Sequence, residues 1–266
     1  MPGVPHEMKG MMEEIVMPGL ERHFSLPHIT HRTLLTFGVG ESFLADLVID
    51  FENSLPENFK LAYLPNFGLV RLRLSATDTN KNNVEKEMDD LFLQLQHLVM
   101  PYLITNSDKT LEQVVGKLLH EKNKTVCTAE SCTGGYIAQL ITSSPGASAY
   151  YEGSIVSYSY KAKENLLDVN ENDLKEHGAV SECIVKQMAI GALQNIKSDY
   201  AIAVSGIMGP GGGMPGKPIG TVWIAVGNLQ KIICSKYNLR FDRERNIQLT
   251  AVNALIMLRD FILKED

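Results

Sequence analysis

The sequence lacks several features that would assign it to a common functional class. It has no apolar run of the length that a bilayer requires, since stretches such as residues 221–227 are far too short. Its first residues lack the basic segment and apolar core of a signal peptide. Its four cysteines form no CxxC pair, which is typical of reduced thiols. We therefore expect a cytoplasmic protein without a membrane partner.

Basic residues are also scarce. The chain has 25 Lys and Arg against 31 Asp and Glu, a net charge of −6, and no long basic block. This balance argues against a nucleic-acid-binding protein, although it leaves room for a local pocket that binds a small anion. With 266 residues, 44% of them hydrophobic, the chain can form one large domain or two ordinary ones.

Metal-binding patterns are weak as well. Four of the seven histidines fall early, at His6, His23, His28 and His31. No cysteines or clustered carboxylates accompany them, so scattered surface histidines are the better interpretation. We expect no metal and no cofactor.

Residues 25–106 have the pattern of a small α+β domain. Strand patterns at 32–37, 60–64 and 69–76 alternate with helical patterns at 40–53 and 82–99. The order β-α-β-β-α predicts one sheet with its helices packed against it. A boundary follows near residue 107, where Ser107 or Asp108 could cap the next helix.

Residues 107–266 alternate between strand and helix. Strands are expected at 124–129, 153–159, 199–206, 219–227 and 231–239, with a long final helix that Asp242 caps. This order predicts a three-layer α/β/α domain with a mainly parallel sheet, in which the last two strands are antiparallel.

The segment AESCTGG, residues 129–135, leads from a buried strand into a helix. Ligand sites in open α/β sheets lie at such strand ends, where free N–H groups suit a phosphate or an oxyanion. Ser131, Cys132 and Thr133 could each be a nucleophile. On the residues alone, Ser131 or Thr133 could equally be a helix cap, with Gly134 and Gly135 allowing close packing.

A nucleophilic serine needs a base. His177 is the only histidine after Lys122, so a Ser-His-Asp triad would have to use it. A desolvated lysine can serve instead, and YSYKAK places Lys161 and Lys163 just after a strand end. Both alternatives remain open at this point.

A second loop, SGIMGPGGGMPGKP, follows the strand at 199–206. It fits neither the Walker pattern nor GxGxxG. Its glycine density still predicts backbone N–H groups near a phosphate, with Lys217 adding charge. The predicted binding residues here are Ser205, Gly206, Gly209, Gly211, Gly212 and Lys217.

Together these motifs resemble the CinA family. The pieces AESCTGG, PGAS, YS with Lys163 five residues after Tyr158, HGAVS, SGIMGPGGG and KPIGTVW occur in that family's order, over about residues 109–264. Residues 25–106 resemble its KH-like middle domain. Residues 1–24, with PGVPHEM, resemble the end of its molybdopterin-binding-like first domain, whose body is expected to be missing.

The resemblance implies hydrolysis of nicotinamide mononucleotide to nicotinic acid mononucleotide and ammonia. It implies Ser131, Tyr158 and Lys163 as the catalytic set, with no metal, and a homodimer. Glu130, Thr133, Gly134 and Gly135 are carried over as substrate-binding residues, and we expect the N–H groups of Thr133 and Gly134 to hold the oxyanion. The alternative is a non-catalytic nucleotide-binding or scaffold protein linked to competence or DNA damage.

The sequence departs from the family pattern at three positions. Tyr160 replaces an asparagine, Met208 replaces a small residue, and Phe241 replaces a glycine. The first two positions could reshape the pocket, so they bear on substrate choice more than on fold.

Overall fold

The computed structural model describes residues 4–24, 27–78 and 81–265. It divides into two compact units, the first made of residues 1–64 and 70–108 and the second of residues 65–69 and 109–266. The change of unit between Asp108 and Lys109 lies two residues after the boundary that the sequence predicts. A helical segment precedes the first sheet and consists of α1 (Pro5–Met11), the π-helical turn η1 (Met12–Val16) and α2 (Met17–His23).

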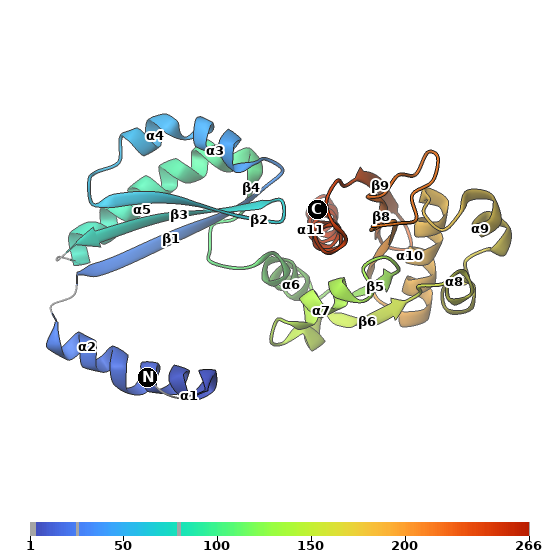
Figure 1. Ribbon diagram of the computed structural model, residues 1–266, viewed down its shortest axis with the longest axis horizontal. Helices are drawn as coiled ribbons and strands as arrows, with labels where there is room; N and C mark the ends of the chain where they lie inside the picture. Colours follow the sequence, from blue (N-terminus) through green and yellow to red (C-terminus); the bar gives the residue numbers. More distant parts are fainter. Residues whose placement is uncertain (1–3, 25–26, 79–80, 266) are drawn as a thin grey trace. The chain divides into compact units, whose positions relative to one another are not determined.

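The first unit contains a four-stranded sheet in the order β2-β3-β1-β4, with helices on one face (Figure 1). Its strands are β1 (His28–Phe37), β2 (Phe59–Asn66), β3 (Leu69–Asp78) and β4 (Leu103–Thr105), and its helices are α3 (Glu41–Leu47), α4 (Ile49–Asn53), α5 (Lys81–Val99) and the 3₁₀ turn η2 (Met100–Tyr102). The predicted order β-α-β-β-α is present.

Two details of this unit differ from the expected pattern. The single helix predicted over 40–53 is broken at Val48, whose φ of −109° and ψ of 13° are not helical. A fourth strand, β4, pairs antiparallel with β1 through Leu35 and Thr105. It is only three residues long, which is too short for an alternation pattern to reveal.

The second unit is built on a five-stranded sheet in the order β6-β5-β7-β8-β9. The strands are β5 (Val126–Glu130), β6 (Tyr151–Val156), β7 (Tyr200–Gly206), β8 (Thr221–Gly227) and β9 (Ile232–Asn238). β5 runs parallel to both β6 and β7, whereas β8 is antiparallel to β7 and to β9. The sheet is therefore mixed, and parallel pairing is confined to the half that contains β5.

Helices cover both faces of this sheet, which gives the predicted three layers (Figure 1). On one face α10 packs on β5, β7, β8 and β9 and contacts α8 and α9, and on the other face α11 packs on β7 and β8 and contacts α6 and α7. The helices are α6 (Leu111–Glu121), α7 (Tyr136–Thr142), α8 (Tyr160–Leu167), α9 (Glu171–His177), α10 (Glu182–Ile196) and α11 (Arg243–Leu263), with the 3₁₀ turn η3 (Ala147–Ala149) after α7.

The caps of these helices follow sequence signals, with one correction. Ser181 caps α10 by accepting the Ile184 N–H, and Asp242 caps α11 by accepting the Arg245 N–H. The cap of α6 is Thr110 rather than Ser107 or Asp108, because the Gln113 side chain accepts the Thr110 N–H at 3.1 Å in a capping box.

Helix α11 is long and apolar enough, by length and composition, to cross a membrane, but 67% of that window is buried inside the domain. Its buried face includes Ala251, Leu255, Leu258 and Ile262. Burial of this extent is typical of a core helix, and α11 is the core helix that positions Arg243 at the sheet's edge.

Candidate functional site

The three parallel strands end at one edge of the sheet, and polar residues follow each end. Ser131 comes directly after β5, Tyr158 lies two residues after β6, and Ser205 and Gly206 end β7. Parallel strands place their carboxyl ends at the same edge, which is where open α/β sheets bind ligands. The structure therefore brings together chain segments that are far apart in the sequence.

Ser131 and Lys163 are joined by a direct hydrogen bond. Lys163 Nζ lies 2.9 Å from Ser131 Oγ, 2.7 Å from the Ser157 carbonyl oxygen and 3.4 Å from the Tyr158 carbonyl oxygen. Ser159 caps α8 and fixes where the helix begins. Lys163 thus lies in the first turn of α8, and its side chain reaches back to the sheet edge.

Lys163 is only 1% exposed, and burial lowers the pKa of its amine from 10.5 to about 8. Burial acts in this direction because a low-dielectric surrounding disfavours the ammonium form. Near pH 8 a large fraction of Lys163 is therefore neutral. In that form Nζ can accept the proton that Ser131 Oγ donates.

The buried carboxylate of Glu130 organises the turn that carries Ser131. Its Oε2 accepts hydrogen bonds from Thr133 Oγ1 at 2.7 Å, Gly135 N at 3.0 Å and Ile137 N at 3.1 Å, and its Oε1 accepts one from Ala138 N at 2.8 Å. These bonds satisfy orphan N–H groups at the start of α7. Glu130 therefore holds the turn together.

The glycines of this turn allow its shape. Gly134 and Gly135 have φ angles of 62° and 99°, a left-handed conformation that a side chain disfavours. Helix α7 consequently begins only at Tyr136, after both glycines.

Only part of the expected oxyanion donor pair is available. The Gly134 N–H donates to the Ser131 carbonyl oxygen at 3.2 Å, and the Ser131 N–H donates to the Val204 carbonyl oxygen at 3.1 Å. Among the residues that the structure describes, the N–H groups of Cys132 and Thr133 have no backbone acceptor. The Gly134 N–H is thus already engaged, contrary to expectation, whereas the Thr133 N–H and the neighbouring Cys132 N–H remain candidate donors.

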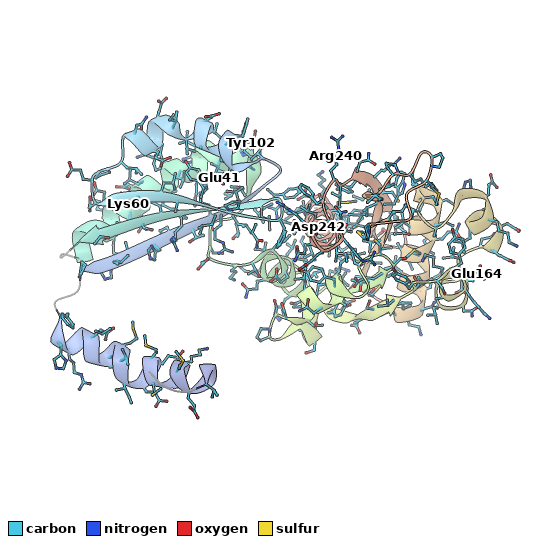
Figure 2. The ribbon with its side chains drawn as sticks, viewed as in Figure 1. Glu41, Lys60, Tyr102, Glu164, Arg240 and Asp242 are labelled. Atoms are coloured by element: carbon cyan, nitrogen blue, oxygen red, sulfur yellow. The ribbon has the colours of Figure 1, made fainter. Side chains whose placement is uncertain are left out.

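A pocket of about 200 Å³ lies beside Ser131. Its cationic lining residues are Lys163 and Arg243. Arg243 Nη1 donates to the Gly209 carbonyl oxygen at 2.9 Å, and Nη2 donates to the Tyr158 hydroxyl at 3.2 Å. Arg243 follows Asp242, the cap of α11, and Figure 2 labels Asp242.

Five of the predicted site residues line this pocket: Ser131, Tyr158, Lys163, Ser205 and Gly206. Eight others do not: Glu130, Thr133, Gly134, Gly135, Gly209, Gly211, Gly212 and Lys217. The pocket also takes in five residues that were not predicted to bind substrate: Cys132, Ala179, Val180, Met208 and Arg243. Of these, Ala179 and Val180 belong to the HGAVS motif, and Arg243 to the FDRE segment.

The glycine loop approaches the site through Arg243 and Asn246. Arg243 binds the Gly209 carbonyl oxygen, and Asn246 Nδ2 donates to the Met208 carbonyl oxygen at 3.1 Å. Lys217 is directed elsewhere, because its Nζ donates to the His177 carbonyl oxygen at 2.5 Å. The loop therefore contributes Met208 to the pocket. The positive charge beside the loop comes from Arg243 of α11 and not from Lys217.

Two other candidate groups are set aside by the geometry. Cys132 is 6% exposed, and burial raises the pKa of its thiol to about 12, so it stays protonated at neutral pH. His177 does not line the pocket. Of the two candidate bases, only Lys163 contacts Ser131, through its amine.

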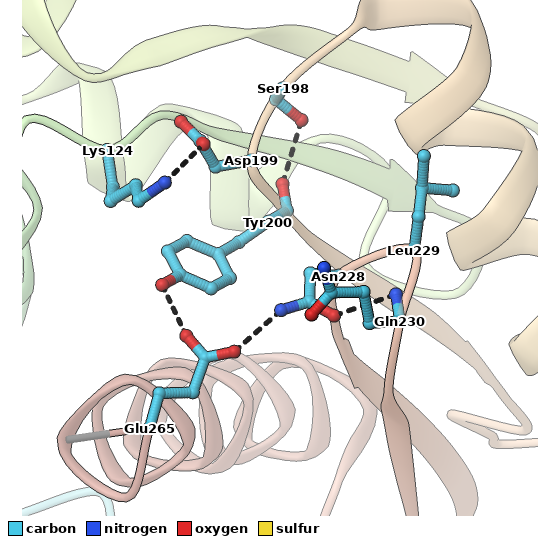
Figure 3. A pocket seen from close by; sticks show the side chains of 8 residues that line it. All are labelled: Lys124, Ser198, Asp199, Tyr200, Asn228, Leu229, Gln230 and Glu265. Atoms are coloured by element: carbon cyan, nitrogen blue, oxygen red, sulfur yellow. Dashed lines mark hydrogen bonds and ion pairs between the residues drawn. The ribbon is translucent and has the colours of Figure 1, made fainter.

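A larger pocket of about 510 Å³ lies at the opposite end of the strands, around Tyr200 (Figure 3). Its polar groups pair with one another: Lys124 with Asp199 at 2.8 Å, and Asn228 with Glu265 at 2.6 Å. Because these groups are satisfied and lie at the amino ends of β5 and β7, the smaller pocket beside Ser131 is the better candidate site.

The sequence matches two family profiles. Residues 108–262 match the CinA C-terminal domain, and residues 31–104 match the damage-inducible protein CinA KH domain. A CinA-like protein of Cytophaga hutchinsonii is 44% identical over 97% of this chain and 62% of its own length. A CinA-like protein of Flavobacterium psychrophilum is 42% identical over 99% of this chain and 63% of its own length. The chain thus spans under two thirds of these curated relatives.

Solved structures resemble a little over half of this chain. The competence damage-inducible protein A (ComA) of Klebsiella pneumoniae is 35% identical, with a TM-score of 0.57, and the match covers 59% of this chain and 97% of that one. The competence/damage inducible protein CihA of Agrobacterium tumefaciens is also 35% identical, with a TM-score of 0.56, over 57% of this chain and 93% of that one. With both domains matched in their order, the chain belongs to the CinA family.

Proposed function

We propose that this protein hydrolyses the carboxamide of nicotinamide mononucleotide, giving nicotinic acid mononucleotide and ammonia. The observation that carries the proposal is the buried contact of 2.9 Å between Lys163 Nζ and Ser131 Oγ in a pocket. A serine beside a desolvated lysine is suited to acyl transfer. Family membership adds the nicotinamide nucleotide as the substrate that the sequence motifs imply.

The reaction would begin with a proton transfer. Neutral Lys163 accepts the proton of Ser131 Oγ directly, because Nζ contacts that oxygen. Oγ attacks the amide carbon, the C–N bond breaks, and the Lys163 ammonium returns the proton to the leaving ammonia. Water then attacks the acyl ester with Lys163 again as base, and Ser131 regains its proton.

The negative charge of the tetrahedral intermediate needs hydrogen-bond donors. The N–H groups of Cys132 and Thr133 follow Ser131 in the turn and have no backbone acceptor within the described chain. Donors of this kind contribute about 3 kcal/mol each to lowering the barrier. They would act together with the rigid turn that Glu130 holds.

Arg243 would bind the nucleotide phosphate. Lys163 must be neutral to act as base, so the positive charge among the pocket's lining residues falls to Arg243. Its guanidinium is held between Gly209 and Tyr158, and a guanidinium suits bidentate contact with phosphate. In this arrangement the Tyr158 hydroxyl positions Arg243. It takes no part in the proton transfer between Ser131 and Lys163.

The direct test is ammonia release from nicotinamide mononucleotide. Ser131→Ala should abolish release, whereas Cys132→Ala should keep most of it, because the Cys132 thiol is protonated and its backbone N–H is unchanged. An active Ser131→Ala together with an inactive Cys132→Ala would overturn the serine assignment. Measurable binding without any turnover by the unmodified protein would instead favour a nucleotide-binding or scaffold role.

Three further expectations remain predictions: a cytoplasmic location, a homodimer, and the absence of a nucleic-acid partner. The KH-like domain bears on the last of these. KH modules clamp nucleotides with a GXXG loop, whereas residues 31–104 contain only Gly38, Gly40 and Gly68. Electrophoretic mobility shifts with single-stranded DNA and RNA would test this prediction.

A further inference from the structure

A cluster of metal-ligand side chains lies outside the pocket, at the contact of α9 with α10. The ligand atoms of Asp173, His177 and Cys183 all lie within 4.8 Å of one another. Asp173 and His177 are four residues apart on α9, which places them on one face. Cys183 comes from the first turn of α10. A carboxylate and an imidazole from α9 thus lie close to a thiol from α10.

Gln187 orients two of these three groups. Its Nε2 donates to Asp173 Oδ2 at 2.6 Å and to Cys183 Sγ at 3.2 Å. Its Oε1 accepts the Asn170 N–H at 2.8 Å, which fixes the amide orientation. One side chain therefore donates to both anionic ligand types, as outer hydrogen-bond donors do around bound metals. No direct hydrogen bond among Asp173, His177 and Cys183 is present in the described structure.

We infer that Asp173, His177 and Cys183 bind a divalent transition metal of the zinc class, with Gln187 holding the carboxylate and the sulfur in place. A mixed set of oxygen, nitrogen and sulfur donors favours Zn²⁺ and excludes Mg²⁺ or Ca²⁺, which prefer oxygen alone. Water would supply the fourth ligand. The inference does not depend on the proposed amide hydrolysis, because none of these residues lines the pocket.

The metal would restrain the segment that forms one wall of the pocket. His177 is followed at once by Gly178, Ala179 and Val180, and the last two line the pocket beside Ser131. Ser205 Oγ already binds the Ala179 carbonyl oxygen at 2.8 Å. A metal between α9 and α10 would also restrain residues 178–180 through His177, which precedes them. We therefore expect stabilisation of the domain and no metal requirement for the chemistry.

Cobalt and zinc titrations of the whole protein test the site. After EDTA treatment and dialysis, Co²⁺ should bind with a thiolate-to-cobalt absorption band, and Zn²⁺ should displace it and raise the thermal midpoint. Cys183→Ser should remove the band, and His177→Ala should weaken Zn²⁺ binding at least about 10-fold. Gln187→Leu should weaken it about 10–100-fold, the usual effect of losing an outer-shell partner.

Cys234→Ser is the matched control, because Cys234 is also a partly exposed free thiol but lies on β9. It should bind Co²⁺ as the unmodified protein does. Metal-free thermal unfolding of each variant shows that the fold is retained. Absence of the thiolate band in the unmodified protein would overturn the inference, as would its persistence in Cys183→Ser or its loss in Cys234→Ser.

Discussion

At the scale of single residues, Lys163 is the side chain on which the candidate site depends. It is buried, and no carboxylate contributes to its pKa. Its amine is held by oxygen acceptors from Ser131 and from the backbone of Ser157 and Tyr158. Carbonyl oxygens orient a neutral amine without supplying the full counter-charge that would raise its pKa.

The pH dependence of the reaction follows from this lysine. Its pKa is lowered to about 8, and the base form is the neutral amine, so kcat/KM should rise about tenfold per pH unit below that value and level off above it. Initial rates of ammonia release across pH 6 to 10 measure this profile. A profile that is flat below pH 8 would contradict the assignment of Lys163 as base.

The same lysine should limit stability. The pKa of Lys163 is lower in the folded protein than in the unfolded chain, so between pH 8 and 10.5 the unfolded chain binds more protons. As the pH rises through this window, Lys163 therefore lowers the free energy of unfolding by less. Lys163→Met should therefore be inactive yet more stable than the unmodified protein at pH 7. Its advantage should shrink by about 2 kcal/mol between pH 7 and 9.5.

Urea unfolding at the two pH values measures that difference. The matched control is Lys161→Met in the same turn of α8, where the lysine is exposed and no such pH-dependent advantage is expected. If the stability advantage of Lys163→Met increased with pH instead of decreasing, the pKa of Lys163 could not be lowered in the folded protein.

Arg243 provides a second residue-scale prediction. If it binds the nucleotide phosphate, Arg243→Gln should raise KM for nicotinamide mononucleotide about 10–100-fold, the value of a hydrogen bond to a charged group, with kcat changed little. With nicotinamide riboside, which lacks the phosphate, the variant and the unmodified protein should turn over alike. Arg240→Gln is the control, since Arg240 is exposed and extends outward (Figure 2). Equal losses with both substrates would contradict a phosphate role.

The sequence could predict Ser131 and Lys163 but not Arg243. Ser131 and Lys163 each follow a strand end, and parallel strands bring such ends together. Arg243 opens a helix 85 positions after Tyr158, and its contact depends on how α11 crosses the sheet. No local pattern encodes that crossing, although FDRE marks the helix start.

At the scale of elements, the turn between β5 and α7 rests on one buried carboxylate. Replacing Glu130 with Gln turns one acceptor oxygen into an NH₂ group, which faces either the Ile137 N–H at the Oε2 position or the Ala138 N–H at the Oε1 position. We expect a loss of on the order of 2–4 kcal/mol in the free energy of unfolding and a fall in activity, because Ser131 is the next residue. Denaturant unfolding and ammonia release measure both.

Glu152→Gln is the control for that variant, since Glu152 is exposed on the neighbouring strand β6. It should leave stability and activity unchanged. A stable and fully active Glu130→Gln would show that the turn holds its shape without the carboxylate, and it would reopen a substrate-binding role for Glu130.

The strands and helices of the second unit could be predicted from the sequence, but the direction of β8 could not. A glycine-rich connection of residues 207–220 is long enough for either a crossover or a hairpin. Two bonds close it as a hairpin: the Ile207 N–H to the Thr221 carbonyl oxygen at 2.9 Å, and the Gly220 N–H to the Ile207 carbonyl oxygen at 2.7 Å. These two hydrogen bonds depend on backbone geometry that the glycine content of the loop does not determine. The sequence therefore predicts a mainly parallel sheet and misses the antiparallel pairing of β7 with β8.

At the scale of the whole molecule, two separate hydrophobic cores underlie the two units. One contains Leu34, Leu72 and Met88, and the other contains Ile184, Met188 and Ala203. The sequence predicts a boundary near residue 107 because the strand and helix order changes there. Each core is contained within one unit, so each unit has the basis for folding by itself.

A fragment of residues 109–266 should therefore fold and hydrolyse nicotinamide mononucleotide with kcat and KM within about twofold of the whole chain. All ten lining residues of the pocket fall inside this fragment. The match to the Klebsiella pneumoniae structure covers 97% of that chain and 59% of this one. Circular dichroism, cooperative urea unfolding and ammonia release would be compared for the two proteins. A fragment that folds cooperatively but turns over slowly would show that residues before 109 complete the site, and Arg243 and Ser131 would then be insufficient by themselves.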